Sequence, residues 1–240
     1  MAPYEPKRLT SINGVTPSAE VREKLAAEGK PVLVAFSGGK DSICAELALR
    51  EAGVETQLAY LYQVPGLRFV EDELDRLEDE LGKRIHRYPS PSLFRWLGSG
   101  IFQSQARLEV VGSAELVQLD YQTCWDVIRD DLGLPYETWL ADGVRANDSP
   151  QRRMAFGRYG PMKETTRKVS PIWDWAIKLV RETISESGVG LPVDYEMFGR
   201  TFDGLDARFL RGIRERFPED FERIRAWFPM VELELVRREL

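Results

Sequence analysis

The hydrophobic positions fall into short continuous runs that alternate with stretches of helical spacing. The first run, residues 31–36, has β-branched members and a proline only at its start, which is typical of a strand buried on both faces. It ends at Ser-Gly-Gly-Lys-Asp-Ser, residues 37–42, after which Ile43 and Leu47 share one face of a helix that Gly53 closes. The pattern predicts a strand, a glycine turn and a helix.

Apolar runs and helical spacings keep alternating further along the chain. Residues 69–81 give the clearest helix, because Val70, Leu74 and Leu77 share one face while acidic side chains cover the other. Residues 95–113 have no steady period and predict no element. Further strands are predicted over 54–64, 84–88, 138–144 and 167–172, and further helices over 18–29, 114–132, from Pro150 after a Ser149 cap, and 174–184. Strands alternating with helices indicate an α/β fold with a mainly parallel, five-stranded sheet flanked by helices.

From about residue 191 the pattern becomes helical only. Three helical segments, 203–217, 219–227 and 230–240, are separated by Pro218 and Pro229. The chain is therefore divided into an N-terminal arm and helix (1–29), a sheet domain (30–190) and a small helical C-terminal extension (191–240). Seven side chains are expected to be core residues through which the extension packs on the sheet domain: Phe202, Phe209, Leu210, Phe217, Phe221, Trp227 and Phe228.

Composition narrows the class of protein. The 240 residues are 43% hydrophobic and 30% charged, which is ordinary for a globular chain. Without a long apolar run or an apolar leader, we expect a cytoplasmic protein with no membrane partner. Two cysteines and one histidine argue against a disulfide scaffold, a zinc site and an iron-sulfur cluster. His86 lies in a predicted strand, where a partly exposed side chain is a better interpretation than a catalytic base.

The net charge of −6 is unevenly distributed. Residues 151–168 contain six basic side chains and one acid, Glu164. The basic residues are Arg152, Arg153, Arg158, Lys163, Arg167 and Lys168. The segment is either a local anion site or a solvated face of mixed charge. A nucleic-acid partner is the less favoured interpretation, because the whole chain is acidic and the segment lacks interleaved aromatic platforms.

The glycine turn carries the candidate chemistry. A turn that follows a buried parallel strand lies at the carboxyl edge of the sheet, where such folds bind ligands. Gly38 and Gly39 let backbone N–H groups approach phosphate oxygens, and the following helix presents its positive end. Ser37 and Ser42 add hydroxyl groups, and Lys40 adds a positive charge. The geometry predicts phosphate binding.

In this context, residues 37–42 resemble the PP-loop of the ATP pyrophosphatase superfamily, which has the adenine nucleotide alpha hydrolase-like fold. The resemblance implies that the loop holds the pyrophosphate end of ATP, and that the α-phosphate is attacked to adenylate a substrate. Asp41 is the best placed residue for Mg²⁺, with helix capping as the alternative, and Asp148 and Asp174 are weaker candidates. Phe36, Leu61 and Tyr62 lie at strand ends, where they would flank an adenine ring or belong to the core.

Two further segments narrow the resemblance to the phosphoadenylylsulfate (PAPS) reductase family. Gly143, Arg145, Ser149 and Arg152 lie in a G-x-R-x-x-x-S-x-x-R pattern, and residues 171–175 are similar to that family's P-[IL]-x-D-W. The resemblance covers roughly residues 30–187. It implies that Arg145, Ser149 and Arg152 grip the substrate or nucleotide, since arginine pairs bidentately with phosphate or sulfate oxygens. Surface ion pairing is the alternative for these arginines.

The chain departs from the reductases at its C-terminal end. Those proteins carry a C-terminal cysteine that attacks sulfur, whereas this chain has no cysteine after Cys124. Residues 198–206 take its place and resemble phage-encoded relatives of the family. Cys44, in the first turn of the predicted helix, and Cys124 are each either a reactive thiol or a core residue.

The sequence therefore predicts a PP-loop enzyme that uses ATP and Mg²⁺ to adenylate an unknown acceptor, with Lys40, Asp41 and Arg145 as the catalytic candidates. One alternative is a PAPS or adenylylsulfate reductase, or a sulfur transferase, that uses PAPS or a related nucleotide with Cys44 or Cys124. Another is a non-catalytic nucleotide-binding subunit of a nucleic-acid modification complex. A homodimer is left open.

Overall fold

The computed structural model describes residues 7–237. The first six residues of the predicted arm and the last three of the predicted final helix lie outside the described residues. No helix within residues 7–237 combines the length and the apolar character that crossing a bilayer requires.

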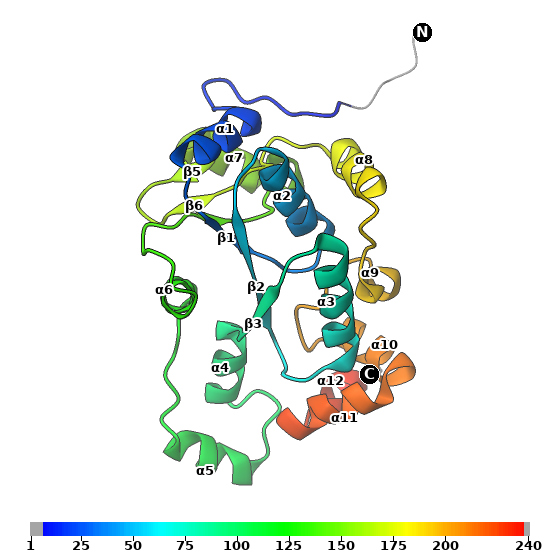
Figure 1. Cartoon of the computed structure of the whole chain (residues 1–240). Coiled ribbons are helices and arrows are strands. Elements are labelled where there is room, and N and C mark those ends of the chain that lie inside the picture. The colour runs from blue at the N-terminus through cyan, green and yellow to red at the C-terminus, as the bar shows by residue number, and fades with distance from the viewer. Residues whose placement is uncertain (1–6, 238–240) are drawn as a thin grey trace. The chain divides into compact units, whose positions relative to one another are not determined.

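A mainly parallel sheet confirms the predicted fold class (Figure 1). Its strands in the described chain are β1 (Val32–Ala35), β2 (Thr56–Tyr62), β3 (Ile85–Pro89), β4 (Leu140–Ala141), β5 (Met162–Lys163) and β6 (Lys168–Val169). They lie in the order β3-β2-β1-β4-β6-β5. Strand β1 is parallel to both β2 and β4, and β4 is parallel to β6. The sixth strand, β5, was not predicted: it has two residues, pairs antiparallel with β6, and is too short to show a pattern.

The helices follow the predicted alternation only in part. Their bounds are α1 (Ser18–Glu28), α2 (Lys40–Glu51), α3 (Arg68–Leu81), α4 (Pro91–Gly98), α5 (Gln105–Ser113), α6 (Tyr121–Asp131), the 3₁₀ turn η1 (Ala146–Asp148), α7 (Pro150–Tyr159), α8 (Ile177–Ser187), α9 (Val193–Phe198), α10 (Ala207–Arg216), α11 (Pro218–Trp227) and α12 (Glu232–Arg237). The predicted helix 114–132 is wrong over 114–120, because the helix in this range, α6, begins only at Tyr121. Helices α4, α5 and α9 were not predicted; α5 has no buried residue and therefore no hydrophobic period.

The chain divides into two compact units, each built from separate segments. The first unit contains the residues through Tyr60, 78–86 and 129–191, and the second contains 61–77, 87–128 and the residues from 192 onward. In the first unit α2 and α8 lie side by side (Figure 1), with Cys44, Ala48 and Val180 buried between them. The boundaries of 1–29, 30–190 and 191–240 stay a prediction.

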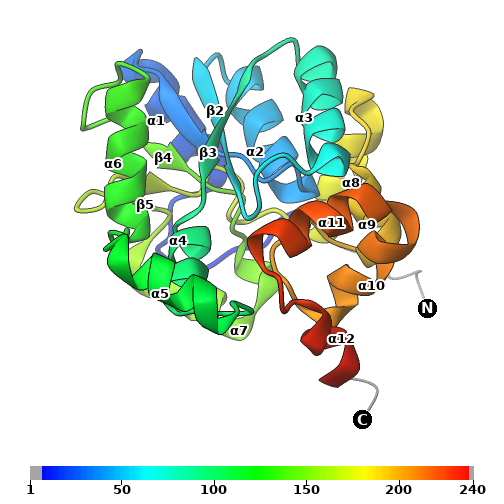
Figure 2. The same cartoon turned by 90° about the horizontal axis from the view of Figure 1, so that it is seen from below.

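The second unit has an aromatic core. Figure 2 shows helices α10, α11 and α12 gathered within this unit. Phe69 stacks on Phe217 at 5.2 Å between ring centroids, and Phe202 meets Phe209 edge-on at 5.4 Å. Of the seven core residues predicted for the extension, five are buried: Phe202, Phe209, Leu210, Phe221 and Phe228. Phe217 is partly buried, and the prediction for Trp227 is wrong because 39% of it is exposed.

Candidate nucleotide site

The loop 37–42 lies at the point of the sheet where the strand order reverses. It follows β1, whose neighbours are β2 on one side and β4 on the other. The chain runs from β1 through α2 to β2, and returns later to form β4 on the opposite side of β1. In open α/β sheets, ligands bind outside the carboxyl ends of the strands at such a switch point. The segment that starts at Gly143 follows β4, so both sequence motifs meet at this edge of the sheet.

Hydroxyl-centred hydrogen bonds hold the loop closed, among them one of 3.2 Å between Ser37 Oγ and Ser42 Oγ. Ser42 Oγ donates to the carbonyl oxygen of Gly39 at 2.9 Å and accepts from the backbone N–H of Ser37 at 3.2 Å. The N–H of Gly39 donates to Ser37 Oγ at 3.4 Å. Gly38 adopts a φ of +70°, which the tight turn requires and which glycine adopts without strain. Because Gly39 occupies the N-cap, α2 receives no side-chain cap from the described residues, and its positive end faces the loop.

Gly143 lies directly against the start of α2. A Cβ atom at this position would lie 2.6 Å from the carbonyl carbon of Asp41 and 2.9 Å from the backbone nitrogen of Ser42. Real Cβ contacts are essentially never this short, and the neighbouring atoms are backbone that cannot rotate away. The glycine of the G-x-R motif therefore has a packing role: it lets the turn after β4 contact the loop after β1.

A chain of alternating charges joins the two motifs. Lys40 Nζ lies 2.6 Å from Asp41 Oδ2, and Asp41 Oδ1 lies 3.0 Å from Arg145 Nε. Arg145 Nη2 then contacts Asp148 Oδ1 at 2.8 Å, and Arg152 Nη1 contacts Asp148 Oδ2 at 2.6 Å. The side chain of Arg145 is only 6% exposed, whereas that of Arg152 is 49% exposed. The chain holds three cations and two carboxylates, which leaves one net positive charge beside the loop.

Ser149 caps α7, as predicted. Its Oγ accepts the backbone N–H of Arg152 at 3.2 Å, and Pro150 is the first residue of the helix. The hydroxyl is thus engaged within the protein. In the basic segment, Arg167 pairs with Glu164 at 2.7 Å and lies over the ring of Trp139, as on an ordinary surface of mixed charge.

The structure favours the core alternative for Phe36 and for both cysteines. Phe36 is 1% exposed. The thiol of Cys44 is fully buried and donates to the carbonyl oxygen of Val180 at 3.5 Å; burial, reinforced by the charge of Asp41, raises its pKa to about 12. Burial also raises the pKa of Cys124 to about 11. At neutral pH neither thiol is appreciably ionised. His86 lies partly exposed in β3, as predicted.

Sequence reasoning missed Asp142, the residue that follows β4 directly. Its Oδ1 accepts the Ser170 hydroxyl at 2.7 Å and the backbone N–H of Val144 at 3.1 Å, and burial raises the pKa of this carboxyl. These bonds shape the turn that carries Arg145. A signal was present, since an acid at the carboxyl end of a parallel strand beside a motif glycine lies at the ligand-binding edge.

One carboxylate at the loop, that of Asp41, fits a magnesium ion that arrives with phosphates. Within residues 7–237 no group of three or more His, Cys, Asp or Glu side chains could hold a metal ion. Mg²⁺ commonly takes only one or two carboxylates together with phosphate oxygens. Asp41 offers such a carboxylate, 26% exposed, although Lys40 and Arg145 share it here. The other two candidates are engaged elsewhere: Asp148 between two arginines, and Asp174 at the start of α1.

Comparison with known proteins gives distant structural likenesses. No protein-family model and no curated protein matches the chain. The chain is similar to a PAPS reductase from Candida auris solved as a phosphate complex (TM-score 0.47, 15% identity, 79% of this chain and 88% of that one). It is also similar to an NH3-dependent NAD synthetase from Campylobacter jejuni, solved with a nitrate ion (0.45, 12%, 92% and 91%), and to a predicted subunit of tRNA methyltransferase from Methanocaldococcus jannaschii (0.39, 18%, 80% and 91%).

The expected fold is confirmed by the chain's own strand order and by the glycine loop between β1 and α2.

Proposed function

We propose that this chain is a PP-loop enzyme that binds ATP at residues 37–42 and transfers the AMP group to an acceptor. The observation that carries the proposal is the placement of a diglycine loop at the switch point of a parallel sheet, before a helix without a side-chain cap. Such a loop binds anions through backbone N–H groups and the helix dipole. The resemblance of the loop to the PP-loop supports the choice of an adenine nucleotide.

Each polar group of the loop has a proposed part. The backbone N–H group of Gly38 and the hydroxyl of the exposed residue Ser37 would bind phosphate oxygens. The N–H of Gly39, which donates to Ser37 Oγ here, would exchange that weak bond for a phosphate oxygen. Lys40 would turn its ammonium group from Asp41 toward the triphosphate, because a polyanion competes with a single carboxylate. Arg145 is buried behind the loop, so it would hold Asp41 in place and add positive potential. Arg152 is exposed enough to touch a ligand directly.

The proposed reaction is a displacement at the α-phosphate. A nucleophilic atom of the acceptor forms a bond to Pα, and the bond between Pα and the bridging oxygen of the β-phosphate breaks. Pyrophosphate leaves with the electron pair, and the acceptor's proton passes to solvent or to a base on the acceptor. Fixed donors lower the barrier by stabilising the negative charge that grows on the phosphoryl oxygens. Bound Mg²⁺ would neutralise part of the charge on the triphosphate, with Asp41 as its protein ligand.

Nucleotide binding and product identity test the proposal together. We expect ATP with Mg²⁺ to bind in calorimetry, and ATP labelled at the α-phosphate to yield a labelled AMP adduct and pyrophosphate when a small-molecule extract supplies the acceptor. Ser37→Ala and Asp41→Ala should lower the rate of pyrophosphate release by at least about 100-fold, because each removes a group beside the phosphates. Ser113→Ala, an exposed hydroxyl on α5, is the matched control and should leave the rate unchanged.

Other products would support other functions. Release of ADP and orthophosphate would contradict attack at the α-phosphate. Tight ATP binding without turnover with any acceptor fraction would favour the non-catalytic subunit. Thioredoxin-dependent sulfite formation from PAPS, lost when Cys44 and Cys124 are both replaced by alanine, would favour the reductase. The buried, un-ionised thiols argue against that last outcome.

A further inference from the structure

Helix α7, in the first unit, presents most of its surface to solvent. Only one of its ten residues, Phe156, is buried, and its ring packs on Trp173 at a centroid distance of 5.3 Å. The Ser149 cap and contacts with η1 fix the start of the helix. Because a helix of this length is not stable in water by itself, these anchors hold it in place. The other faces of α7 are available to a partner.

The exposed surface of α7 is cationic. The helix contains three arginines, Arg152, Arg153 and Arg158, and no acidic residue, and all three arginines are exposed. Arg152 pairs with Asp148. Arg153 donates to a neutral acceptor, the carbonyl oxygen of Ser11, at 3.3 Å. Neither Arg153 nor Arg158 forms an ion pair within residues 7–237, so their charges are not compensated there.

This local charge outweighs the acidity of the whole chain. The net charge is −6, but salt at physiological concentration screens exposed charges beyond about 8 Å. Distant acidic side chains therefore have little effect on a partner that touches α7. The planar guanidinium group of arginine also pairs bidentately with phosphate oxygens. The surface of α7 is thus complementary in charge to a phosphate backbone.

Two exposed side chains beside the arginines offer surfaces for stacking. Met154 is 69% exposed and Tyr159 is 58% exposed. Met154 and Arg158, four residues apart, are neighbours on the helix face opposite Phe156. Arg158 Cζ lies 5.2 Å from the centre of the Tyr159 ring. Nucleic-acid bases stack on aromatic rings and on guanidinium planes, and exposure makes Tyr159 such a platform.

We propose that α7 binds single-stranded RNA. Phosphates of the strand would pair with Arg153 and Arg158, and a base would stack on Tyr159. A duplex would not use this ring, because its bases are stacked inside it, whereas RNA displays unstacked bases in its loops and ends. Gln151, two turns before Arg158, is exposed and has a carboxamide that can bond to the 2′-hydroxyl of RNA. The inference concerns binding and does not depend on the proposed adenylation.

A short labelled oligouridylate tests the proposal with the wild-type chain, because this RNA does not pair with itself. We expect saturable binding in fluorescence anisotropy. The logarithm of the association constant should fall with the logarithm of the salt concentration with a slope of about −1.4, the value for two phosphate contacts. A DNA strand of the same length should bind more weakly, and so should an RNA duplex.

Variants of the two kinds of contact separate charge from stacking. Arg158→Gln should lower RNA affinity about 3- to 10-fold and make the salt slope shallower by about 0.7, because one phosphate contact is lost. Arg181→Gln is the matched control: Arg181 is an exposed arginine on α8 of the same unit, and its loss should change neither quantity. Tyr159→Ala should lower affinity about 5- to 100-fold, whereas Tyr159→Phe keeps the ring and should keep the affinity.

The absence of saturable, salt-dependent binding by the wild-type chain would overturn the proposal. Equal losses in Arg158→Gln and Arg181→Gln would do the same, because they would indicate attraction to the molecule as a whole. A polyglutamate peptide that binds as tightly as the RNA would assign the surface to an acidic protein instead, and DNA that binds as tightly as RNA would overturn the choice of RNA. These comparisons of probes need no variant, so they decide the question even if a variant does not fold.

Discussion

At the scale of single residues, the candidate site depends on one contact between backbones. Gly143 allows the turn after β4 to touch the first residues of α2, and this places Arg145 within 3.0 Å of Asp41. A side chain at position 143 has no space, because the nearest atoms belong to the backbone of Asp41 and Ser42. Gly143 thus controls how closely the turn after β4 approaches the loop 37–42, the proposed anion-binding loop.

We predict that Gly143→Ala loses nucleotide binding and about 1–3 kcal/mol of unfolding free energy, because the added methyl group pushes the turn away from the loop. Urea unfolding and ATP calorimetry measure the two effects. The control is Gly157→Ala in α7, where the nearest atom to a Cβ is Ile12 Cγ2 at 3.7 Å. This second variant should be stabilised by up to about 1 kcal/mol, since alanine is the better helix former. Normal ATP binding by Gly143→Ala would show that the contact is dispensable.

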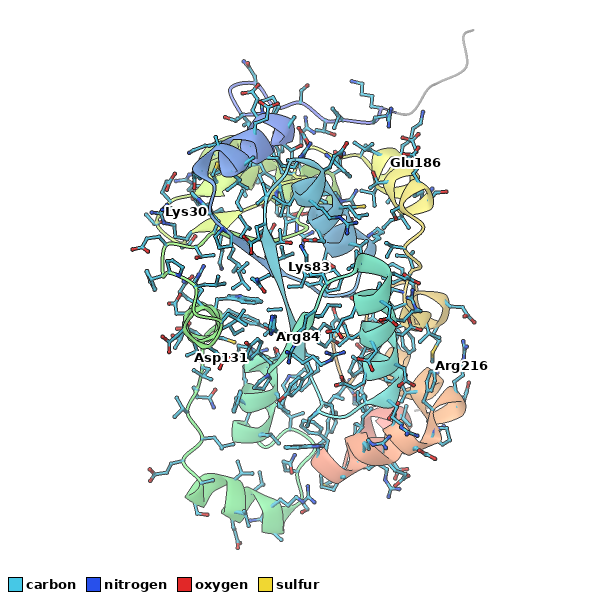
Figure 3. The ribbon with its side chains drawn as sticks, in the orientation of Figure 1. Lys30, Lys83, Arg84, Asp131, Glu186 and Arg216 are labelled. Atoms are coloured by element: carbon cyan, nitrogen blue, oxygen red, sulfur yellow. The ribbon has the colours of Figure 1, made fainter. Side chains whose placement is uncertain are left out.

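At the scale of elements, α2 links the loop to the rest of the first unit. Glu46, in the middle of this helix, is fully buried. It accepts the Thr56 hydroxyl of β2 at 2.6 Å and pairs with Lys83 at 2.9 Å. Figure 3 labels Lys83 in the segment between α3 and β3, and its ammonium group also bonds to Thr56. The buried carboxylate therefore fixes the helix against β2 and against the start of β3.

We predict that Glu46→Ala lowers the free energy of unfolding by about 2–4 kcal/mol, because it leaves Lys83 and Thr56 without their buried partner. The value lies below the full range for buried pairs, since the Lys83 side chain is 26% exposed. Glu51→Ala, an exposed acid on the same helix, should change stability by less than about 0.5 kcal/mol. Equal losses for the two variants in urea unfolding would assign no special role to the buried carboxylate.

At the scale of the whole molecule, the C-terminal helices form the larger part of a second core. Eleven of the fifteen buried residues in this cluster lie beyond residue 200, and the other four come from the segment between Val64 and Leu93. Asp194 belongs to the same unit. Its Oδ2 accepts the backbone N–H of Phe202, but burial raises the pKa of this carboxyl to about 6. The stability of this unit should therefore depend on whether the Asp194 carboxyl group is protonated.

The raised pKa of Asp194 predicts a pH dependence of stability. Between about pH 4 and pH 6 the folded carboxyl binds a proton that the unfolded chain has released, so its contribution to stability is lost as the pH rises. The full loss, reached above about pH 6, is on the order of 2–3 kcal/mol, and Asp194→Asn should not show it. The stability of the variant relative to the wild type should therefore be greater at pH 7 than at pH 5. Thermal unfolding at both pH values measures it. Asp72→Asn, an exposed acid of the same unit, should follow the wild type; parallel curves for Asp194→Asn and wild type would contradict the assignment.

The sequence by itself determined the elements whose signals are local. The strand at 32–35, the glycine turn, the start of α2, and the Ser149 cap with Pro150 all depend on residues adjacent in the chain. Local chemistry also placed the candidate anion site, because glycine conformations and helix ends need no distant partner. The same limitation explains the missed elements: β5 and α5 have too few buried residues to leave a pattern.

Only the tertiary structure decided what the motif residues contact. The sequence left Arg145 either as an anion-gripping residue, which the family resemblance implies, or as part of a surface ion pair. Folding instead buries it between Asp41 and Asp148, which lie 104 residues before it and 3 residues after it. The close approach at Gly143, the pairing of Asp142 with Ser170 and the burial of both thiols likewise depend on segments far apart in sequence. The physical reason is that burial and electrostatic pairing are set by packing between elements, whereas turns and caps are set within a few residues of one chain segment.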